Sequence, residues 1–195
     1  MPNIEEAKIA GIDGTCRGVV LKTDEDFVVR EKGLEGIKQV EIALHRIGYP
    51  LTYNKIKTMD FYPLKWRIAS LVAIRNQFDF SDEKIKEMGM AAPKFSLITK
   101  IFIKYFSSIS LMAKQAPSIW KRHYGSGELI IKTVDEKSRL IILELIGLNI
   151  DPLFCIYLSG YFSTMIQMVT GSSVICRETK CFYSGSSSHE YELTW

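Results

Sequence analysis

Residues 172–195 are the stretch that most limits what this chain can fold into. From His189 onward, apolar and polar side chains alternate, as in a strand that is buried on one face. A second short strand ends at Cys181, and the Gly/Ser-rich residues 182–188 predict the turn that joins the two. Such a hairpin would bring Cys181 and His189 together, with Glu178 within reach of the same point. A thiolate, an imidazole and a carboxylate are all acceptable zinc ligands.

A similar pattern occurs earlier in the chain. Segments 128–134 and 139–145 alternate in the same way around a short polar turn, which predicts a first β-hairpin. Between the two hairpins, residues 152–171 carry no charged side chain and are about long enough to cross a bilayer. This segment also contains several hydroxyl and amide side chains and has no basic flank, so we predict a buried central helix and no membrane span.

The residues before the first hairpin have mainly helical periodicity. Gly89 is predicted to end one helix, Pro93 to begin the longest one, and Pro117 to begin a short one. The predicted helices cover residues 24–30, 34–46, 63–78, 81–89, 93–112 and 118–124. Together these patterns predict an α+β fold, with N-terminal helices packed on a four-stranded antiparallel sheet made of two hairpins with a crossing helix between them.

The length and composition suit one soluble domain. A chain of 195 residues can bury a core without crosslinks, and 47% hydrophobic with 24% charged residues is ordinary for a globular protein. We expect a single domain over 1–195, with helical parts at 1–60 and 61–125 and the hairpin–helix–hairpin at 126–195. The net charge of +3 gives no reason to expect nucleic-acid binding. Four cysteines and no apolar signal core favour a cytoplasmic protein with reduced thiols.

The last third of the chain contains three short motifs. They are FCIYLSGY at 154–161, ETKC at 178–181, and Gly185 followed by His189-Glu190-Tyr191. Their order resembles the vinyl-4-reductase domain, a small-ligand sensing and scaffold module. The resemblance implies a structural zinc held by Cys155, Glu178, Cys181 and His189, with His189 in the place of the family's usual cysteine. Four protein ligands leave no open position on zinc, so the ion would not be catalytic.

A metal-free interpretation of the same residues stays open. Cys155 would then be a buried thiol, Cys181 a thiol at a strand end, and His189 a surface imidazole. Cys176 shares a strand face with Glu178, and it is either an alternative metal ligand or a core residue.

A second likeness covers the middle of the chain. Tyr62-Pro63-Leu64 and the segment APSIWKRHYGSGEL at 116–129 are similar to an uncharacterised family expanded in myxobacteria. Both families share a fold with haem-based nitric-oxide sensors and with the vesicle-tethering TRAPP subunits. We expect haem binding to be unlikely, because His45 and His123 lie at helix ends and the sensors' Tyr-x-Ser-x-Arg signature is absent after the first hairpin.

The sequence has no catalytic motif. It lacks a Gly-rich phosphate loop, a nucleophile elbow and a His-x-x-x-His pair. We therefore predict a non-enzymatic sensory or regulatory module that binds a small hydrophobic ligand and signals through contacts with a second copy, as a homodimer, or with a partner protein. The alternative is a structural dimeric scaffold without a small-molecule ligand. A ligand retained on purification would favour the sensory module. An exposed apolar face over a solid core would favour the scaffold.

Overall fold

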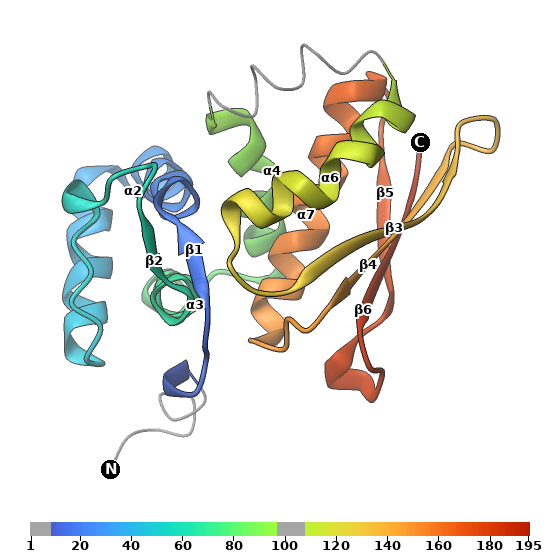
Figure 1. Ribbon diagram of the computed structural model, residues 1–195. Helices are drawn as coiled ribbons and strands as arrows, with labels where there is room; N and C mark the ends of the chain where they lie inside the picture. The colour runs from blue at the N-terminus through green and yellow to red at the C-terminus, as the bar shows by residue number, and fades with distance from the viewer. Residues whose placement is uncertain (1–8, 97–107) are drawn as a thin grey trace.

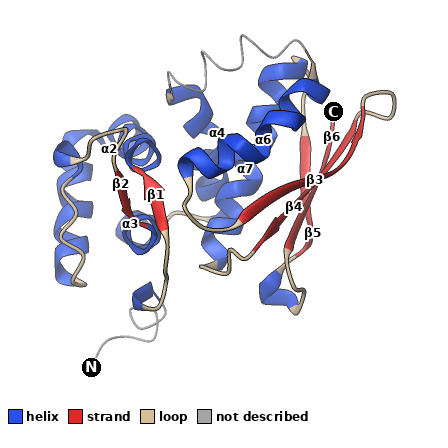
Figure 2. Ribbon diagram, in the orientation of Figure 1, coloured by secondary structure: helices blue, strands red, loops and turns tan. Residues whose placement is uncertain are grey.

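The computed structural model describes residues 9–96 and 108–195, and it confirms the predicted α+β class. Figure 2 shows α6 and α7 beside the larger sheet, with the smaller sheet and its helices beyond them. The elements are, in order, β1 (Thr15–Arg17), α2 (Gly18–Arg46), η1 (Tyr53–Lys55), β2 (Phe61–Pro63), α3 (Leu64–Phe78), α4 (Asp82–Phe95), α6 (Ile109–His123), β3 (Glu128–Asp135), β4 (Leu140–Ile146), α7 (Pro152–Thr170), β5 (Ile175–Lys180), η2 (Phe182–Ser184) and β6 (His189–Thr194).

The larger sheet is made of the two predicted hairpins. Its strand order is β3-β4-β6-β5, and all neighbouring strands are antiparallel. The hairpins meet where β4 pairs with β6, in a register that places Leu143 opposite Tyr191. Both of these side chains are buried, as is Leu193 two residues further along β6. The sheet therefore has an apolar face, and α7 crosses from one hairpin to the other as predicted (Figure 1).

Helix α7 has clear signals at both ends. The Asp151 carboxylate accepts a hydrogen bond from the Leu153 N–H at 2.8 Å, and Pro152 occupies the first helical position. Gly171 ends the helix in the left-handed conformation, with a φ of 71°. Among the described residues, α7 is the one helix long and apolar enough to cross a membrane, and 56% of that stretch is buried inside the fold. Its burial agrees with the predicted central helix.

Helices α4 and α7 contact each other through two glycines. A Cβ atom at Gly160 would lie 2.1 Å from the backbone oxygen of Lys86, and one at Gly89 would lie 2.0 Å from that of Tyr157. The two helix backbones are therefore in van der Waals contact, and a side chain at either position would push them apart.

Replacing Gly160 with alanine is expected to lower the free energy of unfolding by about 1–3 kcal/mol, because the added methyl group overpacks this contact. Urea denaturation of the variant and the wild type would measure the difference. Ser159→Ala is the matched control, since Ser159 Oγ donates to the Ile156 carbonyl of its own helix at 2.7 Å. Equal stabilities for Gly160→Ala and Ser159→Ala would contradict the close approach of α4 and α7.

Helix α2 joins two helices that the sequence predicts separately. It runs from Gly18 to Arg46 and is interrupted at Gly33, whose φ of 69° and ψ of −174° are not helical. The break predicted between residues 30 and 34 is thus a kink and not a loop. The helix also begins earlier than predicted, because its first turn buries Val19 and Leu21.

Three predicted helix boundaries are wrong. Gly89 does not end a helix and Pro93 does not begin one, because both lie inside α4. The predicted helix over 93–112 also covers residues 97–107, which lie outside the described residues. Pro117, predicted to begin a short helix, lies inside α6. Helix α6 buries side chains before and after Pro117, and α4 buries Pro93 itself with the residues before it. This packing outweighs the backbone hydrogen bond that each proline removes.

The first half of the chain adds a small sheet that the sequence did not predict. Strand β1 pairs with β2 in antiparallel fashion, with Cys16 opposite Tyr62. Cys16 also forms an isolated bridge with Tyr124, directly after α6. This bridge joins the N-terminal helices to the part of the fold that contains the larger sheet (Figure 1).

Candidate functional site

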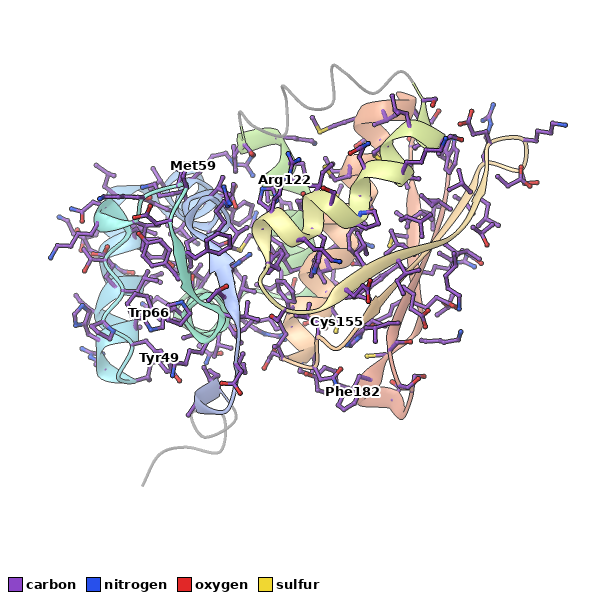
Figure 3. The ribbon with its side chains drawn as sticks, in the orientation of Figure 1. Tyr49, Met59, Trp66, Arg122, Cys155 and Phe182 are labelled. Atoms are coloured by element: carbon purple, nitrogen blue, oxygen red, sulfur yellow. The ribbon has the colours of Figure 1, made fainter. Side chains whose placement is uncertain are left out.

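Four potential metal ligands lie together where the β5–β6 turn approaches α7. They are Cys155, Glu178, Cys181 and His189, and their ligand atoms all lie within 4.8 Å of one another. Cys155 comes from the first turn of α7, Glu178 from β5, and the other two from either side of the turn. Figure 3 shows Cys155 at the same end of the sheet as Phe182, which belongs to that turn.

Local backbone structure holds the turn in shape. The carbonyl of Cys181 accepts hydrogen bonds from the N–H groups of Ser184 at 3.0 Å and Ser186 at 3.1 Å. Gly185 has a φ of 91°, a left-handed conformation that favours glycine. This compact turn returns the chain to β6 at His189, so the thiol before the turn and the imidazole after it face the same point.

The four side chains contact one another directly. His189 Nδ1 lies 2.9 Å from Glu178 Oε1 and 3.5 Å from Cys155 Sγ. Burial raises the pKa of the Cys155 thiol, and the negative charges of Glu178 and Cys181 raise it further. A divalent cation in the cluster would reverse this effect, because metal binding favours the thiolate.

The donor set of this cluster suits a closed, tetrahedral zinc site. Two sulfur atoms, one nitrogen and one oxygen are all donors that zinc accepts, and together they fill its coordination. His189 is only 2% exposed, so it is not the surface imidazole of the metal-free interpretation. Cys176, the alternative ligand, lies outside the cluster as a buried thiol hydrogen-bonded to Ser163.

An apolar pocket lies between the N-terminal helices and the larger sheet. Its volume is about 80 Å³. The walls come from α2, α4, α6, α7 and the first hairpin, and representative lining residues are Val20, Ala92, Ala116, Leu129, Leu143, Leu158 and Phe162. The apolar composition alone left open whether the core was filled or hollow. Cavities lined in this way take up small apolar molecules.

One histidine lines this pocket. His123 is the last residue of α6, and its Nδ1 lies 2.9 Å from the Ile119 carbonyl. Because a carbonyl can only accept, Nδ1 carries the proton and Nε2 of the neutral ring keeps its lone pair. Burial lowers the pKa of His123, which favours this neutral form. The sequence placed His123 at a helix end but did not show that this end lines a pocket.

A buried ion pair lies next to the pocket. Arg67 of α3 donates from Nη1 to Oδ2 of Asp24 in α2, and both side chains are fully buried. Burial raises the pKa of the Asp24 carboxyl to about 7, although Arg67 lowers it. Sequence reasoning missed this pair. The available signal was Arg67 itself, a charged residue spaced like the buried Leu64 and Leu71 along one helix.

Comparison with known proteins gives structural matches alone. No family model and no curated protein matches the sequence. An H-NOX protein from S. oneidensis in the Fe(II)NO ligation state matches with a TM-score of 0.69 at 11% identity, over 91% of this chain and 97% of that one. An oxygen-binding H-NOX domain related to soluble guanylate cyclases matches with a TM-score of 0.64 at 12% identity, over 91% and 94%.

A third H-NOX protein, an Fe(II) unliganded mutant from K. algicida, matches with a TM-score of 0.64 at 11% identity, over 91% of this chain and 95% of that one. Identities this low show a shared fold and nothing more. They confirm the predicted relation to the fold of haem-based nitric-oxide sensors. The resemblances to the vinyl-4-reductase domain and to the myxobacterial family stay predictions.

The expectation that haem is unlikely is contradicted by these matches, because the chains that share the fold include an H-NOX protein in an Fe(II)NO ligation state and one studied for its haem distortion. His123 lies at a helix end, as predicted, but this position does not exclude it from the pocket. It lines the pocket with Nδ1 bonded to the Ile119 carbonyl, which leaves the Nε2 lone pair of the neutral ring, the form that haem iron binds. The chain therefore offers an imidazole in the form that ligates iron, in a pocket whose volume of about 80 Å³ is smaller than a haem.

Proposed function

We propose that this chain is a non-catalytic sensory domain, which binds a small apolar ligand in the pocket and signals by contact with another protein. The observation that carries the proposal is the pocket itself, whose walls come from both halves of the chain. A ligand there would touch α2 and the first hairpin at once, and would favour conformations in which they are close. The fold shared with H-NOX proteins supports a sensory role. Whether the contact is with a second copy stays a prediction.

Haem is a further candidate ligand because of His123, and its binding would require the pocket of about 80 Å³ to expand. His123 would hold its iron through Nε2, while the Ile119 carbonyl fixes the ring through Nδ1. Bound haem would supply an iron that takes a gaseous ligand, as it does in the S. oneidensis protein. The residues of this chain would supply an apolar surround and exclude water from it.

Titration with N-phenyl-1-naphthylamine, a neutral apolar dye, tests the pocket. Ala116→Trp would fill the pocket from α6, and we expect it to weaken dye binding at least about tenfold. Lys114→Trp places the same ring on an exposed position of the same helix and should leave binding unchanged. Hemin is titrated in parallel, with His123→Ala as a further variant. Dye affinity that is equal in Ala116→Trp and the wild type would place the ligand elsewhere and sink the proposal.

We also propose that Cys155, Glu178, Cys181 and His189 bind one divalent transition metal in a structural role. The gathering of four donor atoms from a helix and two strands supports this assignment. A metal there would connect α7 to the β5–β6 hairpin and stabilise the folded state.

A further inference from the structure

Arg67 has hydrogen-bonding capacity that the protein does not use. A guanidinium carries several N–H donors, and here Nη1 alone is bound, to Asp24. Nε and Nη2 are buried and have no hydrogen-bond partner among the described residues. Buried polar groups are nearly always satisfied, so unused donors on a fully buried cation indicate that something else binds them.

The unused donors lie beside the apolar pocket. The Arg67 guanidinium carbon lies 4.6 Å from the ring centroid of Tyr157, and Tyr157 lines the pocket. Tyr124, also in the pocket wall, interacts electrostatically with Arg67. Thr23, the neighbour of Asp24 in α2, is a third lining residue. Arg67 is not itself a lining residue, but it lies behind Tyr157 and Tyr124 of the mainly apolar pocket wall.

We propose that the ligand of this pocket is an apolar molecule with one carboxylate, and that Arg67 holds the carboxylate together with the Tyr157 hydroxyl. This inference rests on the proposed function and names the class of its ligand. A guanidinium is the side chain best suited to a carboxylate, because its N–H groups match the two oxygens. The apolar walls would take the rest of the molecule.

The Asp24 carboxylate does not prevent this arrangement. Asp24 accepts a hydrogen bond from Nη1 of Arg67, whereas the unused donors are Nε and Nη2. Burial favours the protonated acid of Asp24 and raises its pKa to about 7, although Arg67 and Ser70 lower the pKa. Asp24 can therefore take up a proton when a second carboxylate approaches, and Arg67 then keeps one negative partner.

Octanoate and 1-octanol form a matched pair of probes, with equal chains and different charge. We expect the full-length protein to bind octanoate at least about tenfold more tightly than 1-octanol in isothermal titration calorimetry. Because Arg67→Met alone could fail to fold, the test variant is Asp24→Leu/Arg67→Met, which removes both charges. It should bind the two probes equally. Arg17→Met removes an arginine whose guanidinium lies over Phe61, a residue outside the pocket lining, and it should keep the preference.

Each outcome has a separate meaning. Equal affinities of the wild type for the two probes would overturn the carboxylate assignment and leave the apolar-ligand function standing. A preference that survives in the double variant, or that is lost in Arg17→Met, would also overturn the role of Arg67. If neither probe binds the wild type, the proposed function itself is contradicted.

Discussion

Arg67→Met is expected to lower the free energy of unfolding by about 3–5 kcal/mol, because it leaves the Asp24 carboxyl buried without its partner. Both side chains are fully buried, and Oδ1 of Asp24 has no hydrogen-bond partner among the described residues. Methionine keeps much of the arginine volume, so the loss of stability should arise mainly from the unpaired carboxyl and not from a cavity. Urea denaturation followed by circular dichroism would measure it as a lower midpoint with an unchanged m value.

The double variant Asp24→Leu/Arg67→Met is the control for this experiment. Apolar residues of similar volume can replace a buried ion pair at little cost, so we expect the double variant to recover most of the lost stability. A double variant as unstable as Arg67→Met would show that the loss arises from packing. That result would contradict the claim that the unpaired Asp24 carboxyl causes the instability of Arg67→Met.

The same pair predicts how stability depends on pH. The pKa of Asp24 is raised to about 7 in the folded protein, above its value of about 4 in an unfolded chain, so the folded state binds more protons between these values. The stability from this group is therefore complete below about pH 4 and is lost as pH rises to about 7. Removing Arg67 raises the pKa of Asp24 further. The destabilisation in Arg67→Met should therefore shrink when denaturation is repeated at pH 5.

Removal of metal from the cluster at the β5–β6 turn is the second large effect that we expect. A metal present at about 100 times its Kd adds about 2.7 kcal/mol to the free energy of unfolding. In a chain of this size each kcal/mol corresponds to about 2–4 °C, so EDTA should lower the Tm of metal-loaded protein by roughly 5–11 °C. Elemental analysis of the same sample would give the metal content, and thermal melting would give the shift.

Two cysteine variants separate a metal effect from a packing effect. Cys181→Ala removes a partly exposed thiol of the cluster and should abolish both stoichiometric metal and the response to EDTA. Cys176→Ala removes a buried thiol outside the cluster and should keep both. If Cys181→Ala retains one metal per chain, or if EDTA leaves the melting of loaded protein unchanged, the four side chains are not a metal centre.

The parts of the fold that could be predicted are those with a local signal. The two hairpins alternate with period two, and their polar turns mark the ends of each strand. Cys181 and His189 are neighbours because one short turn separates them, so their proximity follows from local sequence. Cys155 lies 34 residues before His189, and only the family resemblance connected it to them.

The parts that could not be predicted depend on contacts between distant segments. Arg67 and Asp24 are 43 residues apart, and no periodicity links a charge in one helix to its partner in another. The role of His123 in the pocket also depends on how α6 lies on α7 and β3. Proline favours the first turn of a helix, which predicts helix starts at Pro93 and Pro117, but tertiary packing places both inside helices.

The glycine contact between α4 and α7 limits how a ligand can enter the pocket. Ala92 of α4 and Leu158 of α7 both line the pocket, and their backbones cannot slide past or separate without breaking the contact at Gly89 and Gly160. These two helices therefore behave as a single rigid wall. A ligand that entered between them would have to break this contact.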